Sequence, residues 1–187
     1  PQVNWGGKAY PADLKLTKFN QPIPFRGSKC DSYEGGIRVP GFANWPGRIK
    51  PKTLSSPQHI VDWLPTIAAI IGATPSVPEG QPGLDGHDFS PLLLTQAMAA
   101  EAKREIYTLW RDPTRQWALR RGDWKIVRYG TGEPAVDSWE LYHLGKDPEE
   151  ARNMAKHHPE IVAELHQRFM KQRAKDKKGP NFKVEMR

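Results

Sequence analysis

The chain has 187 residues, of which 37% are hydrophobic and seven are tryptophan, and its formal net charge is +7. This length allows one sizeable core or two small ones, and the aromatic content excludes a chain that is disordered by composition. No apolar run approaches the roughly 18 residues of a membrane span, and the first residues lack the basic and apolar stretches of a signal peptide.

The positive charge is concentrated near the C-terminus. Residues 168–187 contain eight Lys or Arg against Asp176 and Glu185, so the rest of the chain is close to neutral. Such a basic tail can attract nucleic acid, anionic lipid or a sulfated polysaccharide. We favour the alternative of a solvated helix end, where cations suit the helix dipole.

A single cysteine, Cys30, excludes an internal disulfide and a cysteine-based zinc site. A catalytic thiol is one interpretation of this residue. We favour the simpler one, a small residue in a tight turn.

The first half of the chain predicts an irregular loop, a strand and a helix. Residues 1–24 are rich in proline and lack periodicity. Residues 36–45 alternate apolar and other side chains, which predicts a strand, with Pro40 at an edge or a bulge. Residues 62–72 predict a helix with Asp62 at the N-cap, and its near-continuous apolar run predicts burial against a sheet.

The second half predicts a small antiparallel sheet covered by one helix. Residues 73–88 form a Pro- and Gly-rich connection, and residues 121–123 a tight link. A helix begins at Pro159 and places apolar residues 161, 162, 165 and 169 on one face. The predicted strands are short, aromatic and alternating, at residues 106–110, 116–120, 124–129 and 138–142.

The stretch from residue 24 to 40, PFRGSKCDSYEGGIRVP, resembles the formylglycine-dependent sulfatases of the alkaline-phosphatase-like superfamily. Their pattern is Leu-Arg-Gly-Gly-Lys-Gly-x-x-Tyr-Glu-Gly-Gly-x-Arg-x-Pro. Ordered matches cover nearly the whole chain: Trp45-Pro46-Gly47, Asp62 with Pro65-Thr66, Leu84-Asp85-Gly86, Pro91-Leu92-Leu93, residues 120–125, Glu140-Leu141-Tyr142, residues 147–150 and Asn153. The resemblance implies an α/β fold: residues 1–97 as the C-terminal part of the catalytic α/β domain, and residues 98–187 as a small antiparallel-sheet-plus-helix subdomain with the basic tail.

The chain also departs from the family pattern. Ser28 and Cys30 flank Lys29 where the family usually has glycines. The Cys-x-Pro-x-Arg segment that matures to formylglycine is absent, as are the metal-binding aspartates and the Asp-Asn pair. We therefore expect the chain to be the C-terminal part of a sulfatase, inactive by itself.

Lys29 is the candidate catalytic residue, because the resemblance implies that it contacts the substrate sulfate. Negative charge grows on the sulfate oxygens as the S–O bond breaks, and a fixed cation nearby stabilises that charge. Tyr33, Glu34 and Arg38 are expected to support the turn and strand. We expect Lys125 to be an ordinary strand residue.

Other titratable residues favour structural interpretations. His87 is expected in a loop, and His157 and His158 at a helix start. Asp147, Glu149 and Glu150 lack further ligands at calcium spacing, so we interpret them as helix N-terminal charge.

The resemblance implies that the intact enzyme hydrolyses a sulfate ester with a divalent cation, calcium being the usual one, whose ligands lie outside this chain. The expected partners are a sulfated small molecule or carbohydrate and the N-terminal portion of the same protein, in the periplasm or outside the cell. The alternative is a non-catalytic binding or interaction module, in which the basic tail and the aromatic sheet hold an anionic glycan or another chain. Cleavage of phosphate or phosphonate esters is a third, weaker possibility.

Overall fold

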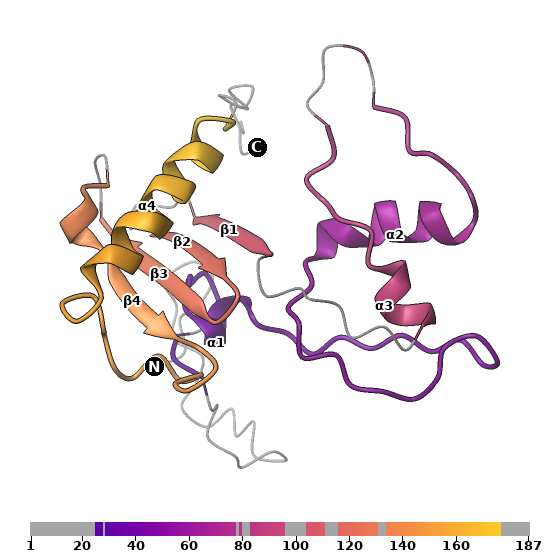
Figure 1. Cartoon of the computed structure of the whole chain (residues 1–187), viewed down its shortest axis with the longest axis horizontal. Helices are drawn as coiled ribbons and strands as arrows, with labels where there is room; N and C mark the ends of the chain where they lie inside the picture. The colour runs from indigo at the N-terminus through magenta and orange to yellow at the C-terminus, as the bar shows by residue number, and fades with distance from the viewer. Residues whose placement is uncertain are drawn as a thin grey trace, which may run out of the picture. The chain divides into compact units, whose positions relative to one another are not determined.

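The computed structural model describes residues 25–27, 29–77, 79, 83–95, 104–110, 116–130 and 134–176. The chain divides into two compact units, one made of Pro1–Ile37 with Tyr107–Arg187 and the other of Arg38–Ile106; their elements are labelled in Figure 1. The assignment of residues 1–97 and 98–187 to two domains of a whole enzyme stays a prediction.

The first unit is built on a four-stranded sheet with the order β1-β2-β3-β4. The link between β2 and β3 is a hairpin in which Arg121 pairs with Trp124, and Gly122 takes a φ of 59° in its turn. Strands β3 and β4 are also antiparallel. The predicted sheet is therefore confirmed, with strands at Glu105–Trp110 (β1), Gln116–Arg121 (β2), Trp124–Tyr129 (β3) and Glu140–His143 (β4).

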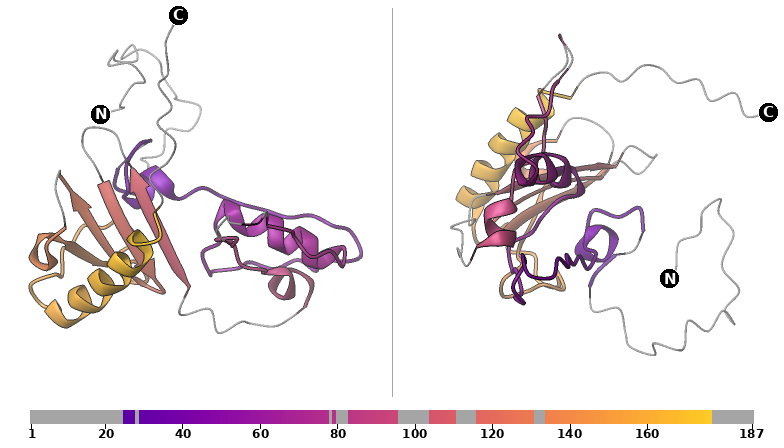
Figure 2. Two further views of the ribbon diagram at one scale, coloured as in Figure 1. Left: turned by 90° about the horizontal axis from the view of Figure 1, so that it is seen from above. Right: turned by 90° about the vertical axis from the view of Figure 1, so that its right-hand side faces the viewer.

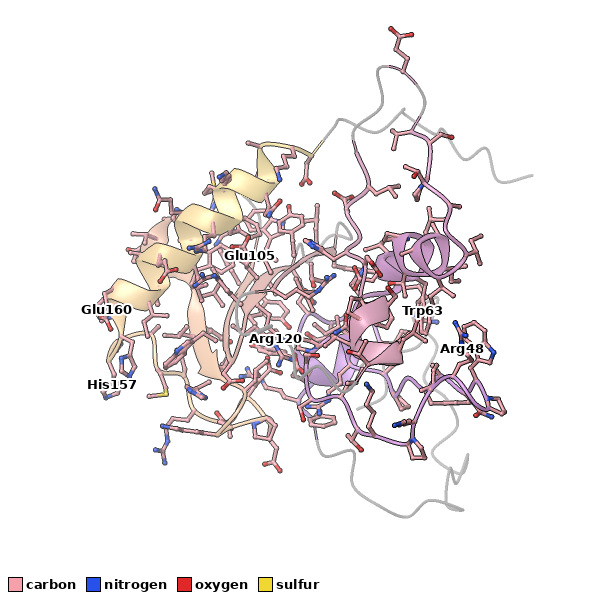
Figure 3. The ribbon with its side chains drawn as sticks, turned by 45° about the vertical axis from the view of Figure 1, so that its right-hand side comes forward. Arg48, Trp63, Glu105, Arg120, His157 and Glu160 are labelled. Atoms are coloured by element: carbon pink, nitrogen blue, oxygen red, sulfur yellow. The ribbon has the colours of Figure 1, made fainter. Side chains whose placement is uncertain are left out.

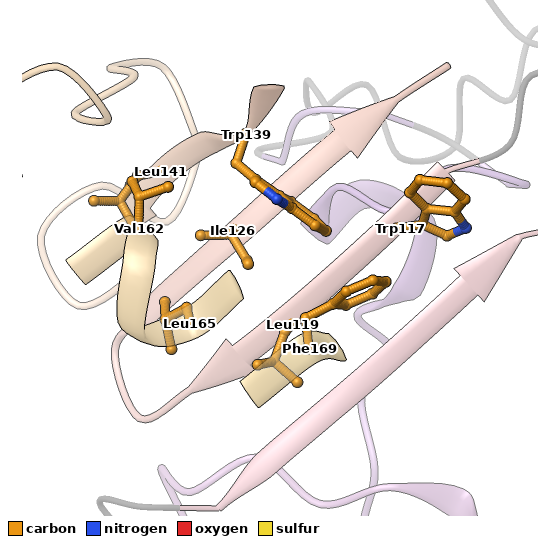
Figure 4. Packing of buried hydrophobic residues seen from close by; sticks show 8 residues of the cluster. All are labelled: Trp117, Leu119, Ile126, Trp139, Leu141, Val162, Leu165 and Phe169. Carbon is orange, nitrogen blue, oxygen red and sulfur yellow. The ribbon is translucent and has the colours of Figure 1, made fainter. Parts of the chain in front are cut away.

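Helix α4, Pro159–Arg173, covers one face of this sheet (Figure 1). It begins at the predicted proline and buries Val162, Leu165 and Phe169. Burying a side chain of this size contributes about 1.5–3 kcal/mol. Figure 4 shows the resulting core, made of Trp117, Leu119, Ile126, Trp139, Leu141, Val162, Leu165 and Phe169.

The opposite face of the sheet is covered by the short helix α1, Glu34–Ile37, and the turn before it (Figure 2). Tyr33 packs there in a second cluster with Ala118, Val127, Tyr142 and Leu144. Both faces of a small sheet are thus buried, one by a helix near the end of the chain and one by a segment from its first quarter.

The second unit contains a 3-10 helix, Ile60–Asp62, followed by α2, Trp63–Ile70, and α3, Ser90–Leu94. The ring of Trp63 lies 5.0 Å from that of Phe89, edge to face, and joins α2 to the start of α3. The predicted helix is confirmed, and Gly72 follows it with a φ of 71°.

Asp62 lies at the N-cap position of α2, as predicted, but its carboxylate makes no capping bond to that helix. It is fully buried and accepts hydrogen bonds from the N–H groups of His59 at 2.6 Å and His87 at 2.9 Å. Arg104 forms an ion pair with it at 2.6 Å. Asp62 therefore joins three segments of the second unit.

The predicted burial of the apolar α2 run is only half right. Thr66 and Ala68 are buried, but the described residues of this unit include no sheet for the other side to pack against. That side exposes Ile60, Leu64, Ile67 and Ile71, which we call the α2 stripe. No helix in the described part of the chain has the length and apolarity to cross a membrane.

The strand predicted at residues 36–45 is wrong. Gly36 and Ile37 end α1, and residues 38–45 have no regular structure. A strand is stable when its backbone groups pair with a neighbour, and no described strand lies beside this segment. Val39 and Phe42 are 80% and 93% exposed, so the alternating pattern is present without a sheet to bury it.

Candidate functional site

Lys29 lies in a tight turn, which we call the lysine turn (residues 26–35 without Ser28). Gly27 and Cys30 take the left-handed backbone conformation on either side of it, with φ of 83° and 72°. Glycine adopts this conformation freely, whereas other residues do so seldom. The turn placement predicted for Cys30 is therefore confirmed, and the Lys29 side chain is exposed.

The two arms of the lysine turn meet backbone to backbone. The Gly35 N–H donates to the Arg26 carbonyl oxygen at 2.7 Å. A Cβ atom at Gly35 would lie 2.5, 2.6 and 2.8 Å from the carbonyl oxygens of Gly27, Arg26 and Phe25. Only glycine allows the arms to approach this closely.

The sheet presents a row of polar side chains to the lysine turn. In a strand, alternate residues share a face, and the register places one such set on the side opposite α4. Gln116 Oε1 accepts from the Ser32 N–H at 2.7 Å, and the Tyr129 hydroxyl bonds to Asp31. We call this face of the sheet the polar sheet face. It consists of Gln116, Arg120, Lys125, Tyr129, Glu140 and Tyr142, with the apolar Ala118 and Val127 between them.

Four charged side chains form a buried ion cluster between the polar sheet face and the lysine turn. Lys125 is fully buried, and its Nζ lies 2.9 Å from Glu34 Oε1 and 2.8 Å from Glu150 Oε1. Arg120, labelled in Figure 3, lies 3.6 Å from Glu34 Oε2. The two cations and two carboxylates balance in charge, and their pairing offsets part of the cost of burying each charge.

Glu150 contacts both arms of the lysine turn. Its Oε2 accepts the Glu34 backbone N–H at 2.6 Å, and its carbonyl oxygen accepts from Arg26 at 3.2 Å. Its own backbone is left-handed, with a φ of 54°. Burial raises the pKa of the Glu150 carboxyl above its ordinary value, and the Lys125 ammonium offsets this only in part.

A second set of contacts lies around Glu140. Both the Tyr33 and Tyr142 hydroxyls donate to its Oε2, at 2.5 and 2.7 Å. The Arg26 guanidinium stacks 3.9 Å from the Tyr33 ring centroid and donates to the Tyr142 hydroxyl at 2.7 Å. Burial, followed by the bond to Glu140, raises the pKa of both tyrosines, so both remain protonated donors at neutral pH.

The structure confirms that Tyr33 and Glu34 support the turn. Both are buried against the sheet, whereas Arg38 is exposed beyond the end of α1. The catalytic role of Lys29 stays a prediction.

Two residues of the buried ion cluster were misassigned from the sequence. Lys125 is not an ordinary strand residue, because it is the central cation of the cluster. Glu150 is not helix N-terminal charge, since α4 begins only at Pro159. The signal available was β3 itself: Lys125 shares a face with the apolar Val127 while Ile126 faces α4, a pattern that indicates burial on both sides.

The three histidines considered above lie in the kinds of segment that the sequence predicts for them. His87 is exposed in a loop, and His158 occupies the N-cap position of α4 beside the exposed His157. Among the described residues, no three His, Cys, Asp or Glu side chains form a group that could hold a metal ion.

The Tyr33-Glu34-Gly35-Gly36 motif, by which the sequence resembles the sulfatases, lies where the lysine turn is fixed to the small sheet. The family model described as N-sulphoglucosamine sulphohydrolase, C-terminal, matches residues 28–175. The chain belongs to this family, and the resemblance seen in its motifs is confirmed.

Individual relatives agree with this assignment. The chain is 33% identical to human arylsulfatase A over 84% of its own length and 34% of that protein. It is 27% identical to an N-acetylgalactosamine-6-O-sulfatase of Bacteroides thetaiotaomicron, over 82% of its length and 31% of that protein. The chain thus spans about a third of the length of these relatives.

Solved structures show the same fold. Ps i-CgsB in complex with a neocarrahexaose superposes with a TM-score of 0.68 at 27% identity, covering 86% of this chain and 34% of that one. A structure from a glycosaminoglycan-metabolism locus of Bacteroides thetaiotaomicron gives a TM-score of 0.62 at 26% identity, covering 81% and 32%. The predicted α/β class with its antiparallel sheet and C-terminal helix is confirmed.

Proposed function

We propose that this chain forms the C-terminal part of an enzyme that hydrolyses sulfate esters, R–O–SO₃⁻ to R–OH and sulfate, and that Lys29 binds the sulfate group. The observation that supports it is the lysine turn, which holds an exposed cation on a backbone fixed at both arms. A preorganised cation stabilises charge that develops on the sulfate oxygens without having to reorganise during the reaction.

The nucleophile and the cation ligands would come from the rest of the protein. By resemblance the nucleophile is a formylglycine hydrate and the cation is calcium. We assign both to residues outside this chain, which by itself would then be inactive. A periplasmic or extracellular location would follow from the same resemblance.

The substrate class we propose is a sulfated carbohydrate or small molecule. Two similar proteins support this: one is named N-acetylgalactosamine-6-O-sulfatase, and one was solved in complex with k-i-k-neocarrahexaose. The basic tail beyond residue 176 lies outside the described residues, and its contact with a polyanion stays a prediction.

The test is the replacement of Lys29 in the full-length protein that contains this chain. Lys29→Ala should lower kcat/KM for an aryl sulfate about 10²- to 10³-fold, or about 3–4 kcal/mol, the scale for one preorganised charge-stabilising group. Lys29→Arg should not restore full activity, because a planar guanidinium does not replace a compact ammonium.

The matched control is Lys171→Ala, since Lys171 is exposed near the end of α4. It should retain wild-type turnover. Retained turnover in a folded Lys29→Ala enzyme would overturn the role of Lys29. Turnover of an aryl sulfate by residues 1–187 alone would overturn the proposed division of the site, and faster turnover of an aryl phosphate would favour the phosphate-ester alternative.

A further inference from the structure

The lysine turn has its two arms fixed by groups that are distant in sequence. Gln116 holds Ser32 and Glu140 holds Tyr33 on one arm, while Tyr142 holds Arg26 on the other. None of these bonds involves Lys29 itself. The sheet therefore determines where the backbone that carries Lys29 lies.

The buried ion cluster is the part of this arrangement that joins the two arms. Glu150 accepts the Glu34 N–H with its carboxylate and the Arg26 side chain with its carbonyl. Lys125, in turn, pairs with the carboxylates of both Glu34 and Glu150. A shift of either Lys125 or Glu150 would displace both arms together.

A cluster of this kind is costly as a purely stabilising device. Apolar side chains of similar volume often stabilise a core as well as a buried ion pair does, whereas a charge-balanced cluster imposes one geometry. Burial raises the pKa of the Glu150 carboxyl, in line with the cost of taking its charge out of water. The contribution of such a cluster is therefore to fix the relative positions of the segments that carry its charges.

We infer that Lys125 and Glu150 are positioning residues for Lys29, acting through Glu34 and the backbone of the lysine turn. This inference rests on the proposed role of Lys29 in binding the sulfate ester. Neither residue touches substrate; each sets the position of the cation that does.

The test is a double-mutant cycle in the full-length protein, with kcat/KM for an aryl sulfate as the readout. Glu150→Gln keeps the volume and an amide oxygen that can accept the Glu34 N–H but removes the charge that pairs with Lys125. In the wild-type background it should lower kcat/KM about 10- to 100-fold, the scale for a catalytic group displaced by about 1 Å. In the Lys29→Ala background it should change kcat/KM less than about 2-fold, because the group it positions is gone.

A merely structural role would lower kcat/KM by the same factor in both backgrounds, and that result would overturn the inference. If Lys29→Ala itself leaves kcat/KM unchanged, the proposed function fails instead, so the two failures are distinguishable. The control is Glu164→Gln, which removes a carboxylate paired with Arg121 and Arg168 at the surface of α4 and should leave kcat/KM at the wild-type value.

Lys125→Met provides the stronger change, since it leaves two buried carboxylates without their shared cation. If neither variant folds, amide hydrogen exchange of the wild-type protein still tests whether the backbone of the lysine turn is fixed. The Glu34 and Gly35 amides should exchange as slowly as those of β3, because Glu150 and the Arg26 carbonyl hold them. Exchange at the rate of an exposed loop would show that the lysine turn is not fixed, and would overturn the inference.

Discussion

Gly35 is the residue where the lysine turn leaves least room for change. Gly35→Ala would drive a methyl group against three backbone carbonyl oxygens that cannot move aside separately. We expect it to reduce the free energy of unfolding by about 1–3 kcal/mol, as for overpacking elsewhere, and to be measurable by urea denaturation. Gly41→Ala is the matched control, because a Cβ there meets nothing within 4 Å. Equal stability of the two variants would contradict the close approach of the arms.

The sequence predicts the lysine turn and two of the residues that support it. The Tyr33-Glu34-Gly35-Gly36 motif identifies the turn, and the buried supporting roles of Tyr33 and Glu34 are confirmed. Lys125 and Glu150 could not be assigned, because their meaning depends on which segment covers the second face of the sheet. Alternation within a strand shows that a face exists and does not show what packs on it.

A hydrogen bond joins helix α4 to Trp139, the residue just before β4. The Trp139 indole N–H donates to His166 Nδ1 at 2.9 Å, and burial lowers the pKa of His166 below its ordinary value. A lowered pKa in the folded state means that this contribution to stability is complete above the unfolded pKa of about 6.5 and is lost as the pH falls below it.

We therefore expect the free energy of unfolding to decrease from about pH 7.5 to about pH 5, and the decrease to be smaller in His166→Gln, which keeps an acceptor and does not titrate. Denaturant unfolding at several pH values measures this difference. His157→Gln, at an exposed position before the helix, should keep the wild-type pH dependence. An unchanged slope in His166→Gln would show that other groups cause the decrease.

The elements themselves were predictable where a strand has its partner within the chain. The strands β1 to β4 lie next to one another in both sequence and sheet, so alternation and turn residues suffice to place them. Residues 36–45 have the same alternation and no described partner. The alternation of side chains alone does not distinguish a paired strand from an unpaired segment with the same sequence pattern.

At the scale of the whole molecule, the described residues include an exposed apolar surface of a kind that isolated globular proteins avoid. Ile60, Leu64, Ile67 and Ile71 of the α2 stripe are 75%, 57%, 51% and 71% exposed and recur at helical spacing. Contiguous apolar patches of this kind mark surfaces that another part of a protein covers. We propose that the α2 stripe packs against a part of the longer protein to which we assigned this chain under the proposed function.

Residues 1–187 alone should accordingly self-associate and bind a hydrophobic dye. The double change Leu64→Lys with Ile67→Lys should reduce both, as measured by light scattering and dye fluorescence. Met170→Lys, which alters an isolated exposed side chain on α4, should have little effect. A monodisperse wild-type monomer with a cooperative melt would contradict the proposal.

The pairing of the lysine turn with Glu150 also sets a time at which the site can form. Glu34 and Glu150 are 116 positions apart, and a ribosome adds about 5–20 residues per second, so the turn is synthesised roughly 6–23 s before the residue that fixes it. During that interval the Lys29 segment lacks its contacts with Glu150, and closing so long a loop makes the step slow as well as late. The lysine turn is thus made early in the synthesis of this chain and reaches its final position late.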